Sequence, residues 1–273
     1  TGISKGGQTT MFYRSYYPDD VDISVPYVAP LNKSLEDGRH ESFLSDKVGT
    51  AAERKVIEDY MMRLVRDREV FLPMFREFVA SKGYEFRVPL DEIYDLCVAE
   101  LRYAIWQWGT PIDSVPGPDS SDEEAFRYLI GINDPDYFSL QSPYVAFNVM
   151  AAKELGYYGY DIRPFRGHMS IVNTKDYLRR VMLGSPENTF EFDNTLYRHV
   201  VRFLKKNDPK MIYIYGEVDP WSASGVCEWL DDSKKENLRI YVKEGGSHST
   251  RISSFDENVQ DEILGKIRQW LEE

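Results

Sequence analysis

Apolar residues along the chain follow two different patterns. Short apolar and β-branched runs, typical of buried strands, occur at 22–31 (DISVPYVAPL), 210–215 (KMIYIY) and 238–242 (LRIYV). Residues 8–17 are predicted to form a helix near the start of the chain, and a helical repeat of apolar residues runs through 258–271. Both ends of the chain therefore carry strand and helix segments typical of an α/β domain.

The long stretch between the first two strands has a helical pattern and no convincing strand alternation. Apolar side chains at helical spacing predict helices around 56–65, 93–108, 144–155 and 193–204. Pro73 is expected to break or kink the first of these. We therefore predict a core formed by residues 1–32 and 209–273, interrupted by a helical insertion over residues 33–208.

Composition places the protein among globular proteins and limits its partners. The 273 residues are 42% hydrophobic and 14% aromatic, which excludes disordered and collagen-like chains. With 45 acidic against 33 basic side chains, the net charge is -12, so we expect neither a nucleic-acid partner nor an anionic membrane surface. No apolar run reaches the roughly 20 residues that cross a bilayer. Cys97 and Cys227 could form one bridge or stay free thiols.

The first candidate for chemistry is a serine at the start of the chain. Residues 2–6 (GISKG) match G-x-S-x-G, a sharp strand-to-helix turn in which small flanking residues push the serine hydroxyl into solvent. The pattern alone also fits an ordinary glycine turn. A serine hydroxyl is a poor nucleophile near neutral pH, so Ser4 needs an imidazole to take its proton and a carboxylate to orient that imidazole.

Both partners are found near the other end of the chain, in the order that this turn requires. Asp219 follows the strand 210–215, and His248 follows the strand 238–242. The separate alternatives are an Asp-Pro turn and a glycine-loop histidine without a catalytic role. Because three residue types occur in the required order on loops of the expected kind, the sequence favours a Ser4, Asp219, His248 triad. No metal-ligand spacing or phosphate-binding loop occurs, so we expect no cofactor and no metal.

Several motifs together resemble a known family. SKGGQT with YVAP downstream, then GEVDPWSASG and GGSHSTRI, are similar to the bacterial tripeptidyl aminopeptidase family of serine peptidases, which is related to prolyl carboxypeptidase and dipeptidyl peptidase II. The resemblance implies an α/β-hydrolase fold with a helical cap. It also implies that Ser4 is the nucleophile, Asp219 the orienting acid and His248 the general base, and that the protein is secreted or periplasmic.

The chain departs from this fold before Ser4. Only three residues precede the serine, whereas several strands precede the nucleophile in the α/β-hydrolase fold. We therefore expect the chain to be the C-terminal portion of a longer enzyme, starting at the nucleophile elbow, with the missing strands in the same or another chain. The backbone N–H of Lys5 is expected to give one oxyanion contact, and a loop upstream of Thr1 the other.

Substrate selection is expected to come from the insertion. An aminopeptidase needs a carboxylate for the free α-ammonium group of its peptide substrate, and an indole can add a cation–π contact. Glu100 and Trp106 are the leading pair for this role, with a solvated acidic face beside an aromatic core as the alternative. Trp221, next to the triad acid, is either a wall of the side-chain pocket or part of the core.

Three functions fit the sequence. The leading one is a serine exopeptidase that releases tripeptides from the free N-termini of peptides through an acyl-enzyme. The others are an esterase or lipase built on the same triad, and a catalytically silent binding module. The absence of a long exposed apolar helix disfavours a lipase, and the presence of all three triad residue types disfavours a silent module. The residue preferred before the cut and the oligomeric state are not determined by the sequence.

Overall fold

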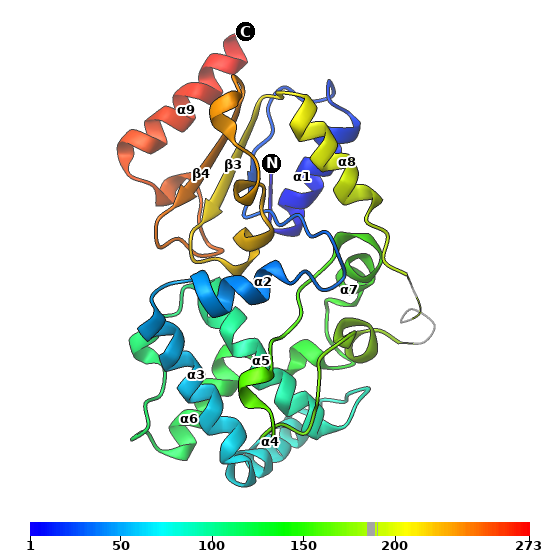
Figure 1. The fold of residues 1–273 in the computed structure, drawn as a ribbon, viewed down its shortest axis with the longest axis vertical. Helices are drawn as coiled ribbons and strands as arrows, with labels where there is room; N and C mark the ends of the chain where they lie inside the picture. The colour runs from blue at the N-terminus through cyan, green and yellow to red at the C-terminus, as the bar shows by residue number, and fades with distance from the viewer. Residues whose placement is uncertain (185–188, 190) are drawn as a thin grey trace. The chain divides into compact units, whose positions relative to one another are not determined.

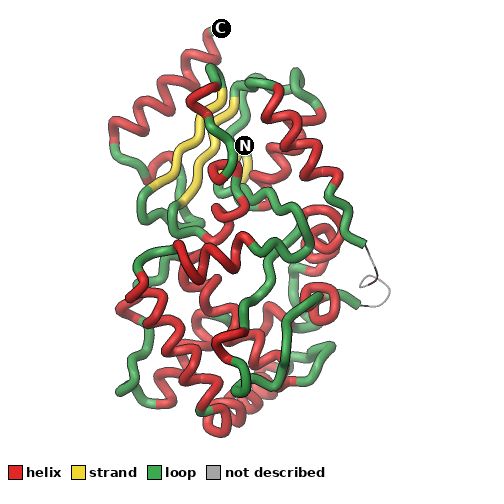
Figure 2. The backbone as a smooth tube through the Cα atoms, in the orientation of Figure 1, coloured by secondary structure: helices red, strands yellow, loops and turns green. Residues whose placement is uncertain are grey.

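The computed structural model of the protein describes residues 1–184, 189 and 191–273 (Figure 1). This part of the chain divides into two compact units. The sheet unit comprises Thr1–Ser34, Trp106–Gly109 and Asp193–Glu273, and the helical unit comprises Leu35–Ile105 and Thr110–Phe192. Strands occur in the sheet unit, whereas the helical unit is drawn as helices and loops in Figure 2.

Four parallel strands form the sheet, in the spatial order β1-β2-β3-β4. The strands are β1 (Gly2–Ile3), β2 (Pro26–Tyr27), β3 (Met211–Gly216) and β4 (Leu238–Lys243). Because all four run in the same direction, their carboxyl ends lie at one edge of the sheet. In open α/β sheets, that edge is where ligands bind.

Helices cover both faces of this sheet. They are α1 (Lys5–Tyr16) and α8 (Thr195–Lys206) on one face and α9 (Glu257–Glu272) on the other (Figure 1). Side chains alternate along β3, so that Tyr213 and Tyr215 join the core under α1 and α8, while Ile212 and Ile214 join the core under α9. Every residue of β3 is buried, as expected of a parallel strand covered on both sides.

The strands at 210–215 and 238–242 and the helices at 8–17 and 258–271 are confirmed by β3, β4, α1 and α9. The strand expected over 22–31 is much shorter, since β2 contains two residues and one further bridge joins Ser24 to Met211. Proline has no N–H for a ladder, and Val28 adopts a left-handed backbone with φ 43°, which a β-branched residue rarely does. Regular pairing with β3 therefore ends at Tyr27, and the N–H of Val28 makes one more bond, to the carbonyl of Ile214.

The helices of the helical unit begin and end at clear local signals. They are α2 (Arg39–Ser42), α3 (Ala51–Arg66), α4 (Arg68–Lys82), α5 (Leu90–Trp108, whose last three residues belong to the sheet unit), α6 (Asp122–Ile132) and α7 (Val145–Met150). Thr50 and Glu53 form a reciprocal capping box at the start of α3, and Ser121 with Glu124 does the same for α6. The helices expected around 56–65, 93–108 and 144–155 are confirmed, the last continuing as a π-helical turn over Ala151–Leu155.

Two expectations for the insertion differ from the structure. Pro73 lies inside α4 and does not break a helix, because the chain already bends between α3 and α4 at Asp67. The segment that forms α8, expected within the insertion over 33–208, belongs to the sheet unit. The reason is that Val200 and Leu204 of α8 are fully buried against α1 and β3.

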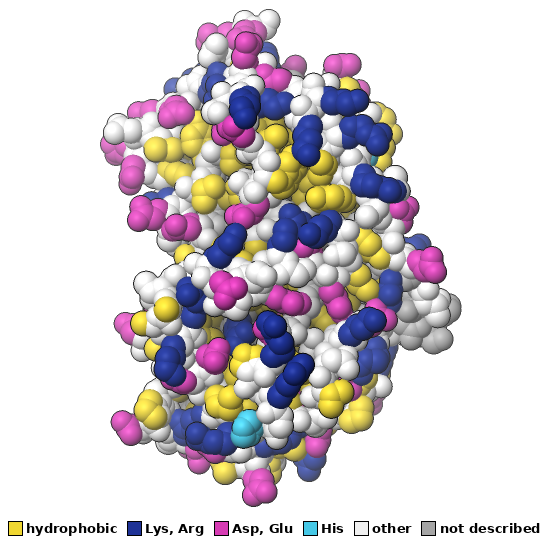
Figure 3. Space-filling view, in the orientation of Figure 1, with side chains coloured by type: hydrophobic (Ala, Val, Ile, Leu, Met, Phe, Trp, Pro, Cys, Tyr) yellow, Lys and Arg dark blue, Asp and Glu magenta, His cyan; other side chains and the backbone are white. Residues whose placement is uncertain are grey.

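The surface carries mixed charges. On the face drawn in Figure 3, acidic and basic side chains are interspersed over the described residues. Several form ion pairs, such as Arg63 with Asp122 at 2.8 Å. Among the described residues, no helix combines the length and the apolar character needed to cross a bilayer.

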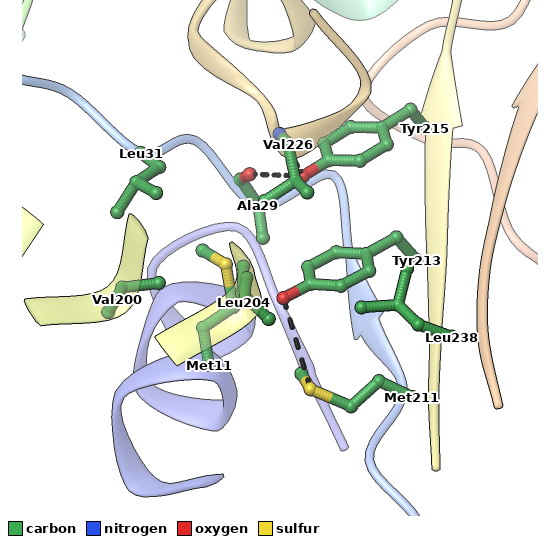
Figure 4. Close-up of a cluster of buried hydrophobic side chains, with 10 residues drawn as sticks. All are labelled: Met11, Ala29, Leu31, Val200, Leu204, Met211, Tyr213, Tyr215, Val226 and Leu238. Carbon is green, nitrogen blue, oxygen red and sulfur yellow. Dashed lines mark hydrogen bonds between the residues drawn. The ribbon is translucent and has the colours of Figure 1, made fainter. Parts of the chain in front are cut away.

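The hydroxyl of Tyr215 joins the segment after β2 to the loop after β3 through two hydrogen bonds, and these bonds predict a stability effect. Its buried hydroxyl donates to the carbonyl of Ala29 and accepts from the N–H of Val226, both at 2.9 Å (Figure 4). We expect Tyr215→Phe to lower the free energy of unfolding by about 2 to 4 kcal/mol, because two buried backbone groups lose their partner. Urea denaturation measures this loss.

Tyr213→Phe is the matched control. Tyr213 is equally buried on the same face of β3, but its hydroxyl contacts only the Sδ of Met211, at 4.0 Å, among the bonds drawn in Figure 4. A sulfur acceptor is weak, so the loss should stay below about 1 kcal/mol. Equal losses in the two variants would show that the hydroxyl of Tyr215 does not hold the two segments together.

Candidate active site

Ser4 occupies a strained turn between β1 and α1. Its backbone has φ 57° and ψ -119°, a conformation that costs a non-glycine residue free energy and is characteristic of the sharp turn before a helix. The N–H of Ser4 donates to the carbonyl of Tyr27 at 2.9 Å, and its own carbonyl accepts the first helical bond from Gln8. The turn is therefore held from both sides, and the serine side chain is half-buried at the carboxyl end of β1.

Glycine at position 2 is needed for this turn. A Cβ added to Gly2 would lie 2.2 Å from the carbonyl oxygen of Gly6, closer than any real contact. Gly2 and Gly6 are the two glycines of the G-x-S-x-G pattern, so the pattern reflects the close approach of two backbone segments. Lys5 is the first residue of α1, so no preceding helical turn supplies an acceptor for its backbone N–H.

Asp219 is held at the carboxyl end of β3. It lies three residues beyond that strand and caps a short 3₁₀ helix, Pro220–Ser224, by accepting from the N–H of Trp221 at 3.1 Å. The carboxylate is fully buried, and this burial raises the pKa of Asp219, while His248 opposes the rise through its charge and hydrogen bond. A buried carboxylate of this kind interacts strongly with a neighbouring imidazole.

His248 is brought to Asp219 by the crossing of two loops. The Nδ1 of His248 lies 2.7 Å from the Oδ2 of Asp219, and the ring is only 5% exposed. The N–H of Val218 donates to the carbonyl of Gly246, so that the loops after β3 and β4 are joined. A Cβ on Gly216 would lie 2.3 Å from that same carbonyl, which means that only glycine at position 216 lets the histidine loop pass this closely.

The three predicted residues thus share one edge of the sheet. Ser4 follows β1, Asp219 follows β3 and His248 follows β4, and all these strands are parallel. Asp219 and His248 are joined by a hydrogen bond. Because Nδ1 of His248 is bonded to Asp219, Nε2 is the ring nitrogen that remains to take or give a proton.

Two indoles contact the His248 ring. Trp221, one of the predicted site residues, is 7% exposed and lies with its ring centroid 6.4 Å from the imidazole. Trp108 is 60% exposed and meets the same imidazole edge to face, at 6.0 Å and 88°. Trp108 is not among the predicted site residues, because it lies 140 positions before His248 and no local pattern connects the two.

Glu100 lies in the helical unit and is enclosed by tyrosines. The Tyr158 hydroxyl donates to its carboxylate at 2.9 Å, and the Tyr160 hydroxyl does so at 2.5 Å. Burial raises the pKa of Glu100 to about 7, although both hydrogen bonds act in the opposite direction. The groups that donate to this carboxylate are two tyrosine hydroxyls, and neither supplies a positive charge.

The remaining predicted residues are placed as follows. Trp106 is buried in the sheet unit near the end of α5, whereas Glu100, on the same helix, belongs to the helical unit. Six residues of α-helix separate the two, which corresponds to about 240° of rotation, so they lie on different sides of α5. Cys97 and Cys227 are both free thiols. Within the described part of the chain, no group of three or more His, Cys, Asp or Glu side chains could hold a metal ion.

Fold and site together define an α/β protein with a serine, a histidine and an aspartate at the ligand-binding edge of a parallel sheet. A family model described as PS-10 peptidase S37 matches residues 1–254, and the chain belongs to that family. The resemblance to tripeptidyl aminopeptidase serine peptidases is thereby confirmed. A prolyl tri/tetrapeptidyl aminopeptidase from Streptomyces mobaraensis is 24% identical over 283 aligned residues. These cover 99% of this chain and 57% of that relative, so the chain spans little more than half of the relative's length.

Proposed function

We propose that the protein is a serine exopeptidase that releases tripeptides from the free N-termini of peptides. In this proposal Ser4 is the nucleophile, His248 the general base and Asp219 the acid that orients it, on an α/β-hydrolase core with a helical cap. The observation that carries the proposal is the buried Asp219 to His248 hydrogen bond at the sheet edge that also bears the strained Ser4 turn. Membership of a peptidase family supports peptide bonds as the substrate.

The first step forms an acyl-enzyme. The Oγ of Ser4 attacks the carbonyl carbon of the scissile bond while its proton passes to the Nε2 of His248. Asp219 accepts from Nδ1, which keeps Nε2 free to take that proton and stabilises the imidazolium that forms. The backbone N–H of Lys5, at the positive end of α1, donates to the developing oxyanion.

The second half of the reaction restores the enzyme. The imidazolium of His248 gives its proton to the departing amine, and the carbon to nitrogen bond breaks. A water molecule then loses a proton to His248 and attacks the ester carbonyl carbon. The bond from that carbon to the Oγ of Ser4 breaks, His248 returns the proton to Oγ, and the tripeptide leaves with a free carboxyl group. No cofactor is needed for either half.

Peptide hydrolysis with and without a free amine tests this function in the intact protein. We expect turnover of a free-amine tripeptidyl aminomethylcoumarin and a fall of at least about 100-fold in kcat/KM when that amine is acetylated, because the ammonium contact is lost. Turnover of both peptides alike would contradict an exopeptidase and indicate an endopeptidase. Turnover of p-nitrophenyl esters alone would indicate an esterase, and no turnover of any substrate would indicate a binding module.

Glu100 is proposed to bind the α-ammonium of the substrate, and Trp221 to form a wall of the pocket for the residue before the cut. Trp106 is left out of the ammonium contact, because it lies on another side of α5. The Tyr158 and Tyr160 hydroxyls hold the Glu100 carboxylate in place. A buried charge gains more from a cationic partner than an exposed one does, because water no longer screens the pair. KM should therefore fall as Glu100 ionises near pH 7, and rise again as the substrate amine loses its proton near pH ~8.

The raised pKa of Glu100 also predicts a pH dependence of stability. The ordinary pKa is 4.5 and the folded value is about 7, so between these pH values the folded state binds more protons than the unfolded state. Stability from this group is therefore present below pH 4.5 and is lost as pH rises through 7, by about 3 kcal/mol in total. Relative to wild type, Glu100→Gln should gain that amount between pH 4.5 and 8 in urea denaturation.

Glu154→Gln serves as the control for this measurement. Glu154 is an exposed glutamate of the same unit, and its replacement should change the free energy of unfolding by the same amount at every pH from 4.5 to 8. If the free energies of unfolding of wild type and Glu100→Gln changed in parallel from pH 4.5 to 8, Glu100 would not be a desolvated carboxylate.

A secreted or periplasmic location is proposed from the family resemblance. Peptides with free N-termini would then be the partners, with no nucleic acid or membrane involved. Fractionation of the source cells with activity assays on each fraction measures this. Activity confined to the cytoplasmic fraction would contradict it.

A further inference from the structure

Trp108 presents an exposed indole beside the histidine of the candidate site. Its side chain is 60% exposed, yet its ring stands edge to face against the imidazole of His248 at 6.0 Å. Trp221 contacts the same imidazole but is 7% exposed. The two indoles around one ring therefore differ in what they offer a ligand, since one is a buried wall and the other an open surface.

The position of Trp108 is fixed by the backbone around it. Gly109, with φ 65°, ends α5 in the left-handed conformation, and the N–H of Thr110 returns to the carbonyl of Ile105. The carbonyl of Gln107 accepts from the N–H of His248 at 2.9 Å. The end of α5 and the histidine loop are thus hydrogen-bonded to each other, which holds Trp108 at a constant place relative to the imidazole.

The chemistry of the imidazole indicates which part of a substrate meets this indole. His248 must deliver a proton to the departing amine, so the nitrogen of the leaving group approaches the imidazole during the reaction. In an exopeptidase, the leaving group is the remainder of a long polypeptide, which has to extend into solvent. The exposed indole of Trp108 suits that departing chain, and the buried indole of Trp221 suits the short acyl fragment.

We propose that Trp108 forms the subsite for the first residue after the cut and favours an apolar or aromatic side chain there. This inference rests on the proposed peptidase function. An indole offers a large, rigid apolar face, and ring contacts of this kind add affinity beyond area burial alone. Because the contact is made with the leaving group, it is expected to act on acylation and not on deacylation.

Free-amine hexapeptides that differ only in the fourth residue test the proposal in the intact protein. With glycine, leucine or phenylalanine at that position, wild type should show kcat/KM for phenylalanine about fivefold to tenfold above that for glycine. In Trp108→Ala, this ratio should fall below about twofold. In Trp108→Phe most of it should return, since a ring is kept. Product analysis by mass spectrometry gives the rates and verifies the cut after residue three.

Trp221→Ala is the matched control, because it removes the other indole that contacts His248. It should change selectivity for the third residue while leaving the phenylalanine to glycine ratio at the fourth residue intact. A ratio that is unchanged in Trp108→Ala, or that falls only in Trp221→Ala, overturns the inference while leaving the proposed function standing. If wild type cleaves none of the hexapeptides, the proposed function fails, and the inference fails with it.

Discussion

Ser4→Ala is expected to lower kcat by about 10⁴- to 10⁶-fold, with little change in substrate affinity. The reason is that the hydroxyl of Ser4 forms the covalent bond, whereas the contacts that hold the peptide lie elsewhere. Removing any single member of such a triad leaves only the catalysis that comes from binding and oxyanion stabilisation. Affinity for a non-hydrolysable tripeptide analogue, measured by calorimetry, should stay within a few fold of wild type.

Two comparisons make this result specific. Ser253→Ala removes an exposed serine of the same unit and should keep wild-type kcat. His248→Ala should be about as severe as Ser4→Ala, and the double variant no worse than either, because the two act in the same step. Wild-type turnover in Ser4→Ala, or additive losses in the double variant, would contradict the proposed roles.

Asp219→Asn is expected to lower kcat by about 10³- to 10⁴-fold without loss of stability. An asparagine amide donates where the carboxylate accepts, so Nδ1 of His248 becomes the acceptor and Nε2 carries the proton. The imidazole then cannot take the proton of Ser4. Because burial raises the pKa of Asp219, removing this charge from the interior relieves a desolvation cost, and the melting temperature should be unchanged or higher.

Asp231→Asn provides the control for Asp219→Asn. Asp231 also caps a short 3₁₀ helix, by accepting from the N–H of Ser233, but it is an exposed carboxylate. It should keep wild-type kcat. If Asp219→Asn retained most of its activity, or if its activity loss were matched by a large fall in melting temperature, the orienting role of Asp219 would be contradicted.

Much of the sheet unit could be predicted because its signals are local. The strand β3 is an apolar run, β4 is a run of apolar, aromatic and β-branched residues interrupted by Arg239, and α9 repeats its apolar residues at helical spacing. The order of Ser4, Asp219 and His248 could also be proposed from sequence, since Ser4 lies in a G-x-S-x-G pattern and Asp219 and His248 each follow a predicted strand. The α/β class therefore followed from patterns only a few residues long.

Other features depend on contacts that no local pattern contains. The early end of β2 depends on the left-handed backbone of Val28, which is stabilised by the bond from its N–H to Ile214 in the neighbouring strand. Gly216 is required because a distant loop crosses the end of β3 at that point. The break expected at Pro73 is wrong, because the helix ends before Asp67 and Pro73 lies inside the next helix. Each of these is decided by tertiary packing.

The site predicted from the sequence is incomplete for the same reason. Trp108 reaches His248 only because the end of α5 is hydrogen-bonded to the histidine loop. Glu100 could be proposed from its helix, but its tyrosine partners come from a separate segment, 58 and 60 positions further along the chain. A sequence pattern identifies the residue types that carry chemistry, whereas the surroundings that tune them come from the fold.

Covalent labelling identifies the nucleophile of the protein. The intact protein is treated with a free-amine tripeptidyl phosphonate diphenyl ester, digested and analysed by tandem mass spectrometry. We expect one phosphonyl adduct, on the Oγ of Ser4, formed far more slowly in His248→Ala and not formed when the reagent's amine is acetylated. An adduct on any other side chain, or no adduct in a folded wild-type protein, would show that Ser4 is not the nucleophile of an aminopeptidase.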